Sequence, residues 1–579
     1  MDIQLIPCKR SDSQTLKYQN YFLHSVYNPE DEAKKFAEKN YQKGNLHILY
    51  GIGLGYYALE ISELFSEKDH LLIVEPNEEI YQTAEQNGFL EILKEKQNVT
   101  ICTFSEGDTV RNNLKIFLAK FKNKHKFITS NNYSKLFPNE LDQIGEWIKE
   151  YLLTEILNLN TVHLFAESWQ RNFIHNLYSL FEAYPINNLH KSIKKPIIIA
   201  SGGPSLLKHL KLLELKRSQF FLIAAGSTIN SLIKYNIQPD LIVSIDGGLP
   251  NYEHFESLDV TIPLACAFTL HEGIAKEYKG DKIVFHVTQD GVYEQLVHKF
   301  MDSEIASFYT GPSVANISLN IATYLTDFPI CLIGQDLSYT NNLTHAAGNL
   351  HSKTINEEYK SKRKMMEREG YHGGQVLTDA AFMSMKNWFE DFLKISEDSD
   401  RIYNCTEGGV KILGMNQMSF AQFLNENAPS TGDENEFADK QFVNEKTLEQ
   451  WRSFYSHLQE TLNNMEKAQY AVKQAKRKLE NRTSLTNNIL RTLEKQDKKL
   501  KNAMEDNFLH LVLNPYLYML HYEKEDETLE GKENEKEKAM IEKSLKLYNT
   551  INKAVDSIFP DVKMIIEKTK KKIDLLEKE

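Results

Sequence analysis

The chain has 579 residues, of which 41% are hydrophobic and 26% charged, so it can bury several cores and is expected to form roughly three or four domains. Its 80 acidic and 68 basic residues give a net charge of −12, which argues against a general nucleic-acid binder because such proteins need a basic face. It has no signal-type N-terminus, no apolar run near the ~18 residues of a membrane span and five scattered cysteines. We therefore expect a cytoplasmic protein without disulfides, a cysteine zinc site or a membrane span.

The N-terminal region has the order of a nucleotide-binding α/β unit. An apolar strand at 46–50 leads into the Gly51–Gly55 turn, a helix follows, and a second strand at 71–74 ends at Glu75. Glu75 is then placed to bind ribose hydroxyls, and the spacing is most like that of a methyltransferase-type Rossmann unit. The alternative is a glycine turn that forms for packing alone.

The central region contains strand patterns that each end in small or acidic residues. The first, at 196–200, is followed by a glycine turn and a leucine-rich helical pattern. Because parallel sheets bind ligands at the carboxyl ends of their strands, we expect a site there. The three strand ends are Ser201-Gly202-Gly203-Pro204-Ser205, Gly226-Ser227-Thr228 and Asp246-Gly247-Gly248.

Further along, Gly311-Pro312-Ser313 partly repeats the first turn and precedes a helical pattern, either as a second polar turn or by coincidence. A strand at 328–333 ends in Gly334-Gln335-Asp336, and His345 lies in the polar segment that follows. The basic stretch from His351 to Arg368 has little apolar periodicity and is typical of a mobile loop or lid.

From about residue 438 glycine nearly disappears and Lys, Glu and Gln dominate. Apolar residues from Trp451 to Leu479 keep the three-four spacing of one helix face, which favours a bundle core over a ligand platform. A helix expected from Phe508 to Tyr522 contains Pro515, which should interrupt it.

These patterns predict an α/β protein with two Rossmann-like α/β domains followed by an all-α helical bundle or coiled coil. The expected boundaries are residues 1–140 for the N-terminal domain, 141–190 for bridging helices, 191–430 for the central catalytic domain and 438–579 for the C-terminal helices.

The order of these motifs resembles the motility accessory factor (Maf) flagellin glycosyltransferases. The resemblance rests on Ser201–Ser205, on Pro239-Asp240 with Asp246, on Gly334–Leu337 and on Asn404–Gly409, with His24–Tyr27 and Gly51–Gly55 in the N-terminal domain. It implies a central domain similar to bacterial sialyltransferases. It also implies transfer of a nonulosonic, sialic-acid-like sugar from a CMP-activated donor to Ser or Thr of flagellin. Some relatives of this central domain are pterin diphosphokinases, so the fold alone does not fix the reaction.

Such a transfer must hold the nucleotide, stabilise the departing phosphate and remove a proton from the acceptor hydroxyl. We predict catalytic roles for His345, as general base, and for Asp336, with His351 and His372 as alternative bases. Backbone amides of the Ser201–Ser205 turn are expected to hold the phosphate. The predicted donor-binding residues are Ser201, Gly202, Gly203, Pro204, Ser205, Ser227, Thr228, Asp246, Gly247, Ser313, Asn316, Gln335 and Glu407.

Structural roles compete with these assignments: a strand–helix turn for Ser201–Ser205, helix capping for Asp246, turn chemistry for Gln335 and Asp336, and capping or turn roles for Asn316 and Glu407. No metal or cofactor is expected, because the leaving group carries one phosphate and the central region has no Asp-x-Asp pair at a strand end. The expected partners are the CMP-sugar and flagellin, with the C-terminal helices as a docking site for flagellin helices. A Mg²⁺-dependent pterin diphosphokinase, a methyltransferase and a non-catalytic flagellin chaperone are the alternatives.

Overall fold

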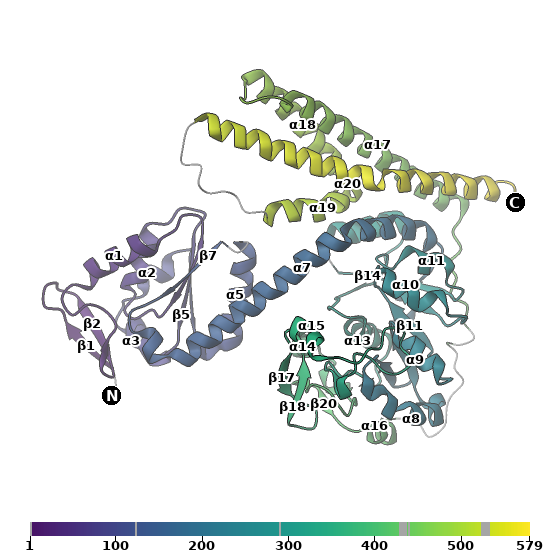
Figure 1. Ribbon diagram of the computed structural model, residues 1–579, viewed down its shortest axis with the longest axis horizontal. Coiled ribbons are helices and arrows are strands. Elements are labelled where there is room, and N and C mark those ends of the chain that lie inside the picture. Colours follow the sequence, from purple (N-terminus) through teal and green to yellow (C-terminus); the bar gives the residue numbers. More distant parts are fainter. Residues whose placement is uncertain (1–2, 122–123, 289–290, 428–436, 438–439, 523–532) are drawn as a thin grey trace. The chain divides into compact units, whose positions relative to one another are not determined.

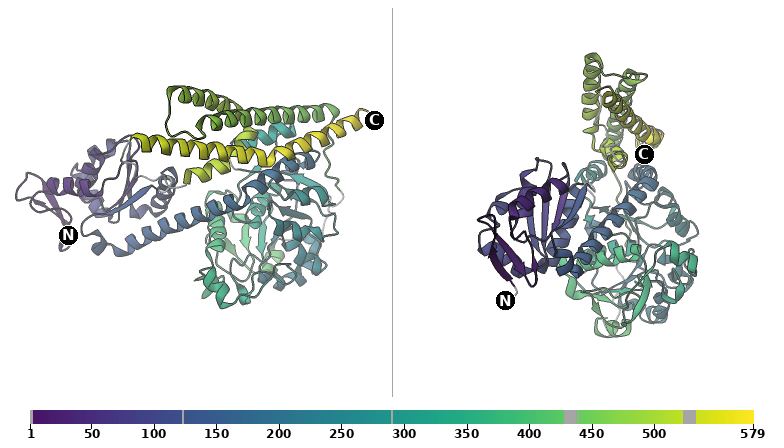
Figure 2. Two further views of the ribbon diagram at one scale, coloured as in Figure 1. Left: turned by 45° about the horizontal axis from the view of Figure 1, so that its top comes forward. Right: turned by 60° about the vertical axis from the view of Figure 1, so that its left-hand side comes forward.

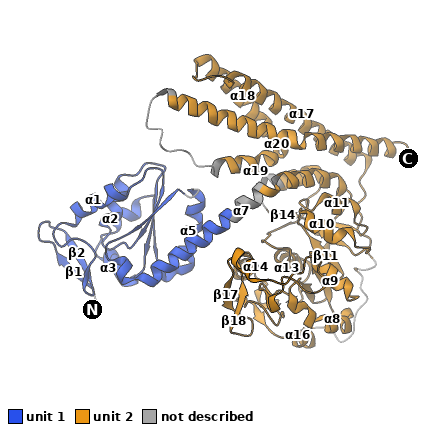
Figure 3. Cartoon of the chain, in the orientation of Figure 1, with its two compact units in different colours: residues 1–160 blue, residues 161–579 orange. Residues whose placement is uncertain are grey.

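The computed structural model describes residues 3–121, 124–288, 291–427, 437, 440–522 and 533–579 (Figure 1). The chain forms two compact units, residues 1–160 and 161–579 (Figure 3). Each unit contains a parallel sheet with helices, and the C-terminal part is helical, so the predicted fold class is confirmed. Within the described residues, no helix is long and apolar enough to cross a membrane.

In unit 1 the described residues form a four-stranded parallel sheet in the order β6-β5-β4-β7. A small antiparallel sheet precedes it, made of β1 (Ile3–Pro7), β2 (Gln14–Tyr18) and β3 (Tyr21–Phe22). The main strands are β4 (Leu46–Tyr50), β5 (His70–Glu75), β6 (Val99–Thr103) and β7 (His125–Thr129). The accompanying helices include α1 (Pro29–Asn40), α2 (Tyr56–Glu63), α3 (Glu78–Gln86) and α5 (Gly107–Lys120).

The glycine turn after β4 is filled by the protein's own side chains. The amide of Ile52 donates to the Glu75 carboxylate at 2.8 Å, that of Gly53 to the Tyr133 hydroxyl at 2.9 Å, and that of Leu54 to His24 Nε2 at 2.8 Å. Glu75 is fully buried and also accepts from Tyr133, so its carboxylate does not face a ribose. The expectation of a ribose-binding Glu75 was therefore wrong, and the packing alternative accounts for this turn.

Helix α7 (Pro138–Ser179) begins in unit 1 and ends in unit 2. In unit 2 its two asparagines satisfy loop backbone: Asn172 Nδ2 donates to the Gly247 carbonyl at 3.0 Å, and Asn176 Nδ2 donates to the carbonyls of Phe268 and Leu270. Polar residues on this otherwise amphipathic helix thus fix the loops that follow two strands of the central sheet.

The described residues of unit 2 build a nine-stranded sheet whose neighbouring strands all run parallel, in the order β20-β19-β16-β9-β10-β11-β12-β13-β8. After β9 the chain adds β10 to β13 on one side, and later places β16, β19 and β20 on the other. The order therefore reverses between β9 and β16, which is where open parallel sheets bind ligands. The strands are β8 (Tyr184–Pro185), β9 (Ile197–Ala200), β10 (Phe221–Ala225), β11 (Leu241–Ser244), β12 (Leu264–Cys266), β13 (Lys282–Val284), β16 (Ile330–Ile333), β19 (Ile402–Asn404) and β20 (Asn416–Gln417).

Helices cover both faces of this sheet because alternate strand residues are apolar on both sides. Ile198 and Ala200 of β9 face a core that also contains α7, α9 (Thr228–Lys234) and the C-terminal helices. Ile197 and Ile199 face a second core with α13 (Val314–Leu325) and α15 (Ala380–Ile395). The remaining helices of this part include α8 (Leu210–Leu215), α10 (Leu249–Glu256), α11 (Glu272–Glu277), α12 (Gly291–Met301) and α16 (Phe420–Asn427).

The C-terminal helices are α17 (Leu448–Leu479), α18 (Asn487–Met504), α19 (Asn507–Tyr522) and α20 (Glu533–Leu576). Helix α17 lies beside both α18 and α20, as the two views of Figure 2 show. Trp451 is 2% exposed and its ring centroid lies 4.6 Å from that of Phe181 on the central core, which confirms the bundle-core interpretation. Pro515 lies inside α19 and does not end it, so the expected interruption was wrong.

Two other local expectations need correction. The leucine-rich helix after the first glycine turn is divided into a 3₁₀ segment, Pro204–Lys208, and the short helix α8. The stretch from His351 to Arg368 is more ordered than a loop, because it contains α14 (Glu357–Lys362) and most of β17 (Met366–Glu369), which pairs antiparallel with β18 (Gln375–Thr378).

Candidate active site

A pocket of about 220 Å³ opens at the carboxyl edge of the central sheet, where the strand order reverses. We call it the switch-point pocket. Loops after β9, β10 and β16, the first turn of α13 and the segment after Leu343 contribute its polar wall, and two apolar side chains of α15 close one side. It is lined by Ser201, Gly202, Gly203, Ala225, Gly226, Ser227, Thr228, Ser313, Val314, Ala315, Gly334, Gln335, Asp336, Leu337, Ser338, Thr344, His345, Phe382 and Met385.

Most of the predicted site residues meet in this pocket although they are up to 144 positions apart in sequence, from Ser201 to His345. The structure brings together both predicted catalytic residues and much of the predicted donor-binding set. The predicted residues that line the pocket are Ser201, Gly202, Gly203, Ser227, Thr228, Ser313, Gln335, Asp336 and His345.

Asp336 holds the loops after β9 and β16 together. Its buried carboxylate accepts hydrogen bonds from the Ser205 amide at 3.2 Å, from the Ser205 hydroxyl and from the Thr340 hydroxyl at 2.6 Å. Burial raises the pKa of the Asp336 carboxyl above its ordinary value, while the hydrogen bonds from Ser205 and Thr340 act in the opposite direction. With its oxygens already engaged, this carboxylate is suited to position the turn.

The turn after β9 does not present a row of free amides. The Ser201 amide donates to the Ile333 carbonyl at 2.9 Å, the Gly203 amide to the Gly334 carbonyl at 2.8 Å, and the Ser205 amide to Asp336. In the part of the chain that the structure describes, the amide of Gly202 alone among Ser201, Gly202, Gly203 and Ser205 has no such partner. The expectation that several amides of this turn grip a phosphate was therefore wrong.

The first turn of α13, instead of the turn after β9, has the features of an anion-binding site. Ser313 caps this 12-residue helix: its hydroxyl accepts from the Asn316 amide at 3.3 Å, and Asn316 Oδ1 accepts from the Ser313 amide at 3.1 Å. Val314 and Ala315 line the pocket, so the positive end of the helix dipole faces it. The predicted second polar turn is thus confirmed as a helix start, and it provides an environment for a negatively charged group.

Two buried polar atoms at the pocket wall also lack partners. The Ser201 hydroxyl and the Gln335 side-chain carbonyl make no hydrogen bond within the described residues, although both side chains are about 5% exposed. Leaving such groups without a partner costs about 1–3 kcal/mol each, unless water or a ligand supplies one. Because both residues line the same pocket as the α13 terminus, they indicate a binding site for a polar molecule.

His345 is held over the glycine turn by its own segment. The next residue, Ala346, donates its amide to the Gly202 carbonyl at 2.8 Å, and the Asn349 side chain donates to the Ser227 hydroxyl at 2.9 Å. His345 Nδ1 lies 3.1 Å from the Thr344 hydroxyl. Burial lowers the pKa of His345, and the neighbouring His351 adds to this effect, so its imidazole is neutral and able to accept a proton near pH 7.

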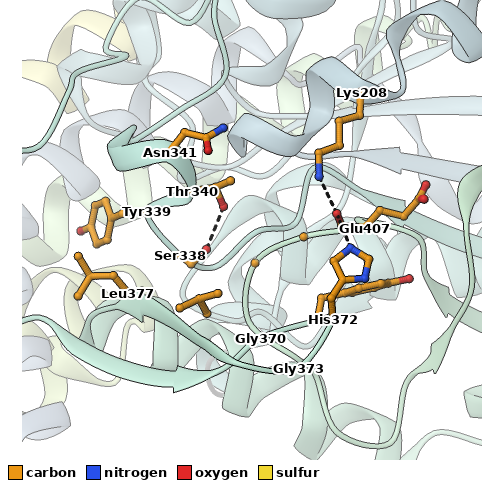
Figure 4. Close-up of a pocket in the computed structure, with 14 residues that line it drawn as sticks. Lys208, Ser338, Tyr339, Thr340, Asn341, Gly370, His372, Gly373, Leu377 and Glu407 are labelled. Carbon is orange, nitrogen blue, oxygen red and sulfur yellow. Dashed lines mark hydrogen bonds between the residues drawn. The ribbon is translucent and has the colours of Figure 1, made fainter.

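A second pocket, of about 310 Å³, adjoins the first, and Ser338 lines both. We call it the hairpin pocket because residues of the β17–β18 hairpin form one wall (Figure 4). Two side chains in it, Lys208 and His372, both donate to the Glu407 carbonyl, at 2.8 and 3.1 Å. The Glu407 carboxylate accepts from the Phe420 amide at 3.1 Å. Glu407 and His372, both predicted from the sequence, therefore belong to this pocket.

The remaining predicted residues lie outside both pockets. Asp246 is exposed and accepts from the Gly248 amide at 2.8 Å, and an added Cβ at Gly247 would lie 2.5 Å from Asn172 Nδ2. Asn316 is fully buried and engaged in the α13 cap. Pro204 and Ser205 are buried behind the turn. His351 lies 3.4 Å from the Glu253 carboxylate. For these positions the structural alternatives account for the side chains.

Sequence reasoning missed several side chains that the structure brings to the site. Thr340 bonds Asp336, Asn349 fixes the His345 segment, and Lys208 brings a positive charge to the hairpin pocket. Thr340 lies four residues after Asp336 and Asn349 four after His345, so proximity to a candidate residue was the available signal. Lys208 follows the glycine turn by three residues but reads as an ordinary surface lysine of an amphipathic helix.

Comparison with known proteins agrees with this architecture. The sequence model of the 6-hydroxymethylpterin diphosphokinase MptE-like family matches residues 171–342, a range that contains β9, β10 and β16. A solved structure of a Maf glycosyltransferase from Magnetospirillum magneticum AMB-1 superposes with a TM-score of 0.56 and 12% identity, over 98% of this chain and 93% of that one. No curated protein sequence matches the chain at a significant level. The chain has the Maf fold. The resemblance found in the sequence is thus confirmed for the fold, and the activity is addressed separately.

Proposed function

We propose that this protein is a glycosyltransferase that moves a nonulosonic acid from a CMP-activated donor to Ser or Thr hydroxyls of flagellin in the cytoplasm. The observation that carries the proposal is the switch-point pocket, which combines the positive end of α13 with a neutral, half-buried His345. The similarity of the fold to a Maf glycosyltransferase supports the same reaction class.

In this proposal the α13 terminus and the Gly202 amide hold the single phosphate of the donor and stabilise the charge that develops on it as the sugar departs. The Ser201 hydroxyl and the Gln335 carbonyl contact polar groups of the donor. Asp336 keeps the turn in place through Ser205 and Thr340, so we assign it a positioning role.

His345 accepts the proton of the attacking hydroxyl through its neutral imidazole. The hairpin pocket adjoins the donor site at Ser338. It offers a place for the acceptor segment of flagellin to bind next to the donor. His372 serves as the alternative base from that side.

A Mg²⁺-dependent diphosphokinase is the second candidate, because the family match covers the switch-point strands. Of the described residues that line the pocket, Asp336 alone carries a carboxylate, and its oxygens are bonded to Ser205 and Thr340. A diphosphate held through Mg²⁺ needs carboxylates free to bind the metal. The pocket therefore favours a donor with one phosphate.

The test is a nucleotide-binding screen by calorimetry with CMP, ATP and S-adenosylmethionine, followed by incubation with CMP-nonulosonate and flagellin in the presence of EDTA. We expect CMP to bind and flagellin to gain the mass of the sugar. Binding of ATP with Mg²⁺ and no binding of CMP would favour the diphosphokinase. Binding of S-adenosylmethionine in unit 1 would contradict the filled glycine turn.

A further inference from the structure

A cluster of side chains of the types that bind metal ions lies in unit 2. One of its residues lies on β14 (His286–Val287) and two lie on helix α12. Strand β14 pairs with β15 (Ser307–Phe308). We propose that His286, Glu294 and His298 bind a divalent transition-metal ion, with zinc preferred. None of the three lines the switch-point or the hairpin pocket, so the proposed site is independent of the proposed reaction.

The three side chains converge from two elements. Glu294 and His298 are four residues apart on α12 and therefore share one face of the helix. His286 comes from the strand: its Nε2 lies 3.9 Å from the Glu294 carboxylate, and its ring centroid is 5.6 Å from that of His298.

One potential ligand atom from each of the three residues lies within 4.8 Å of the other two. Donor atoms around a tetrahedral zinc at ~2.0–2.1 Å are about 3.3 Å apart, so a modest rotation of these side chains would complete the geometry.

The two imidazoles are oriented as metal ligands usually are. His298 Nε2 lies 3.2 Å from the Ile305 carbonyl, and His286 Nδ1 lies 3.4 Å from the Val287 carbonyl. A ring nitrogen that donates to a backbone carbonyl leaves the other nitrogen deprotonated and fixed in direction. In His286 the nitrogen on the other side of the ring is the one that approaches Glu294.

The donor set selects the metal. Two imidazole nitrogens and one carboxylate suit zinc and its neighbours in the first transition row, whereas Mg²⁺ and Ca²⁺ prefer oxygen ligands. The side chain of Glu294 is 46% exposed, so solvent can reach the cluster and supply a fourth ligand.

A metal bound at this position would stabilise the packing of helix α12. Helix α12 contacts the C-terminal helices: Lys299 pairs with Glu460 at 2.9 Å, and the Phe300 ring packs on Phe454 and Phe508. A metal that ties α12 to β14 would hold this helix against the two-stranded β14–β15 sheet. Binding should therefore stabilise unit 2 and protect α12 from hydrogen exchange.

The experiment uses the full chain, stripped with a chelator and titrated with ZnCl₂, with metal content measured by mass spectrometry and stability by thermal unfolding. We expect one zinc per chain and a higher unfolding temperature. Glu294→Gln keeps the shape of a half-exposed side chain and should weaken binding at least tenfold, and His298→Ala should abolish it. Cobalt(II) should give the intense visible absorption of a four-coordinate site in the wild type, and His298→Ala should lose it.

The matched control is His190→Ala, which removes an exposed histidine of the same unit outside the cluster and should leave zinc binding unchanged. The proposal is overturned if the wild type retains no zinc, or if Glu294→Gln, His298→Ala and His190→Ala bind it equally. Hydrogen exchange of residues 294–301 that is the same with and without zinc would overturn the structural consequence.

Discussion

Gly202 and Gly203 are adjacent in the turn after β9, and we predict opposite responses to the same added methyl group. A Cβ at Gly203 would overlap Asp336 Oδ1 and lie 2.5 Å from the Gly334 carbonyl oxygen. A Cβ at Gly202 would have Thr228 Oγ1 as its nearest neighbour, at 3.4 Å, with His345 Cδ2 at 3.9 Å. The first methyl collides with the buried frame of the site, and the second enters the switch-point pocket.

The sizes of the two effects follow from these surroundings. Gly203→Ala forces the Asp336 carboxylate out of a position fixed by Ser205 and Thr340, and overpacking of this kind costs about 1–3 kcal/mol, with ~1–3 kcal/mol more for each buried hydrogen bond that breaks. Gly202 does not adopt a left-handed conformation, so Gly202→Ala should leave stability unchanged or raise it by about 0.4–1 kcal/mol through the unfolded chain.

The two variants are compared by urea denaturation and by calorimetric titration with CMP. Gly203→Ala should unfold at lower urea than the wild type. Gly202→Ala should unfold at the same or higher urea but bind CMP at least tenfold more weakly, a loss of about 1.4 kcal/mol. Gly107→Ala is the matched control, because an added Cβ there meets nothing within 4 Å and lies outside the pocket.

Two results would refute this reasoning. If Gly202→Ala binds CMP like the wild type, the pocket beside Gly202 does not hold the nucleotide. If Gly203→Ala is as stable as the wild type, the Asp336 carboxylate is not confined as the structure indicates.

Three further predictions concern other parts of the chain. His345→Ala should lower transfer at least a hundredfold while CMP affinity stays within threefold, and His372→Ala should retain transfer if His345 is the base, measured by mass spectrometry of flagellin. Burial raises the pKa of Glu75 to about 7 from an ordinary 4.5, so folding favours its neutral form. The free energy of unfolding of unit 1 should therefore fall by about 3 kcal/mol as pH rises from 4.5 to 7. Hydrogen exchange of residues 46–75 should report this pH dependence, and Glu75→Gln should remove most of it. Trp451→Ala should destabilise unit 2 by about 3–5 kcal/mol in urea unfolding, and an unchanged midpoint would contradict its place in the shared core.

Much of the fold was predictable because buried parallel strands leave a strong signal. Ile197–Ala200, Phe221–Ala225 and Ile330–Ile333 are continuous apolar runs that end at glycine or serine, and all are strands in the structure. Helix α19 and the elements within residues 351–368 were harder to predict from the sequence. Pro515 lies inside a helix held by packing on the core, and β17 is stabilised by pairing with β18, and neither effect is visible in a local window.

The C-terminal helices show a related limit of sequence reasoning. Their composition differs from that of the central region, yet Trp451 packs on Phe181, and α17 to α20 share one core with the sheet. A truncation after residue 437 would therefore remove part of that core as well as any surface that binds flagellin. Exposed substitutions, such as Tyr470→Ser on α17, are a cleaner test of flagellin docking, because Tyr470 is 57% exposed.

The site itself shows why a glycine-rich turn does not by itself indicate phosphate binding. Gly203 makes room for the Asp336 carboxylate, Gly409 for the Asp336 backbone, and Gly334 for the Ser201 carbonyl, so each is required by the contact between β9, β16 and the loop after β19. That contact depends on strand order, which brings Ser201 beside Gly334 across more than 130 positions of sequence. Gly202 differs, because it lines the pocket and an added Cβ there would meet only ordinary contacts, the nearest at 3.4 Å. The sequence alone could not distinguish Gly202, which faces a ligand site, from the glycines that only make room for packing. That distinction required the strand order of the sheet.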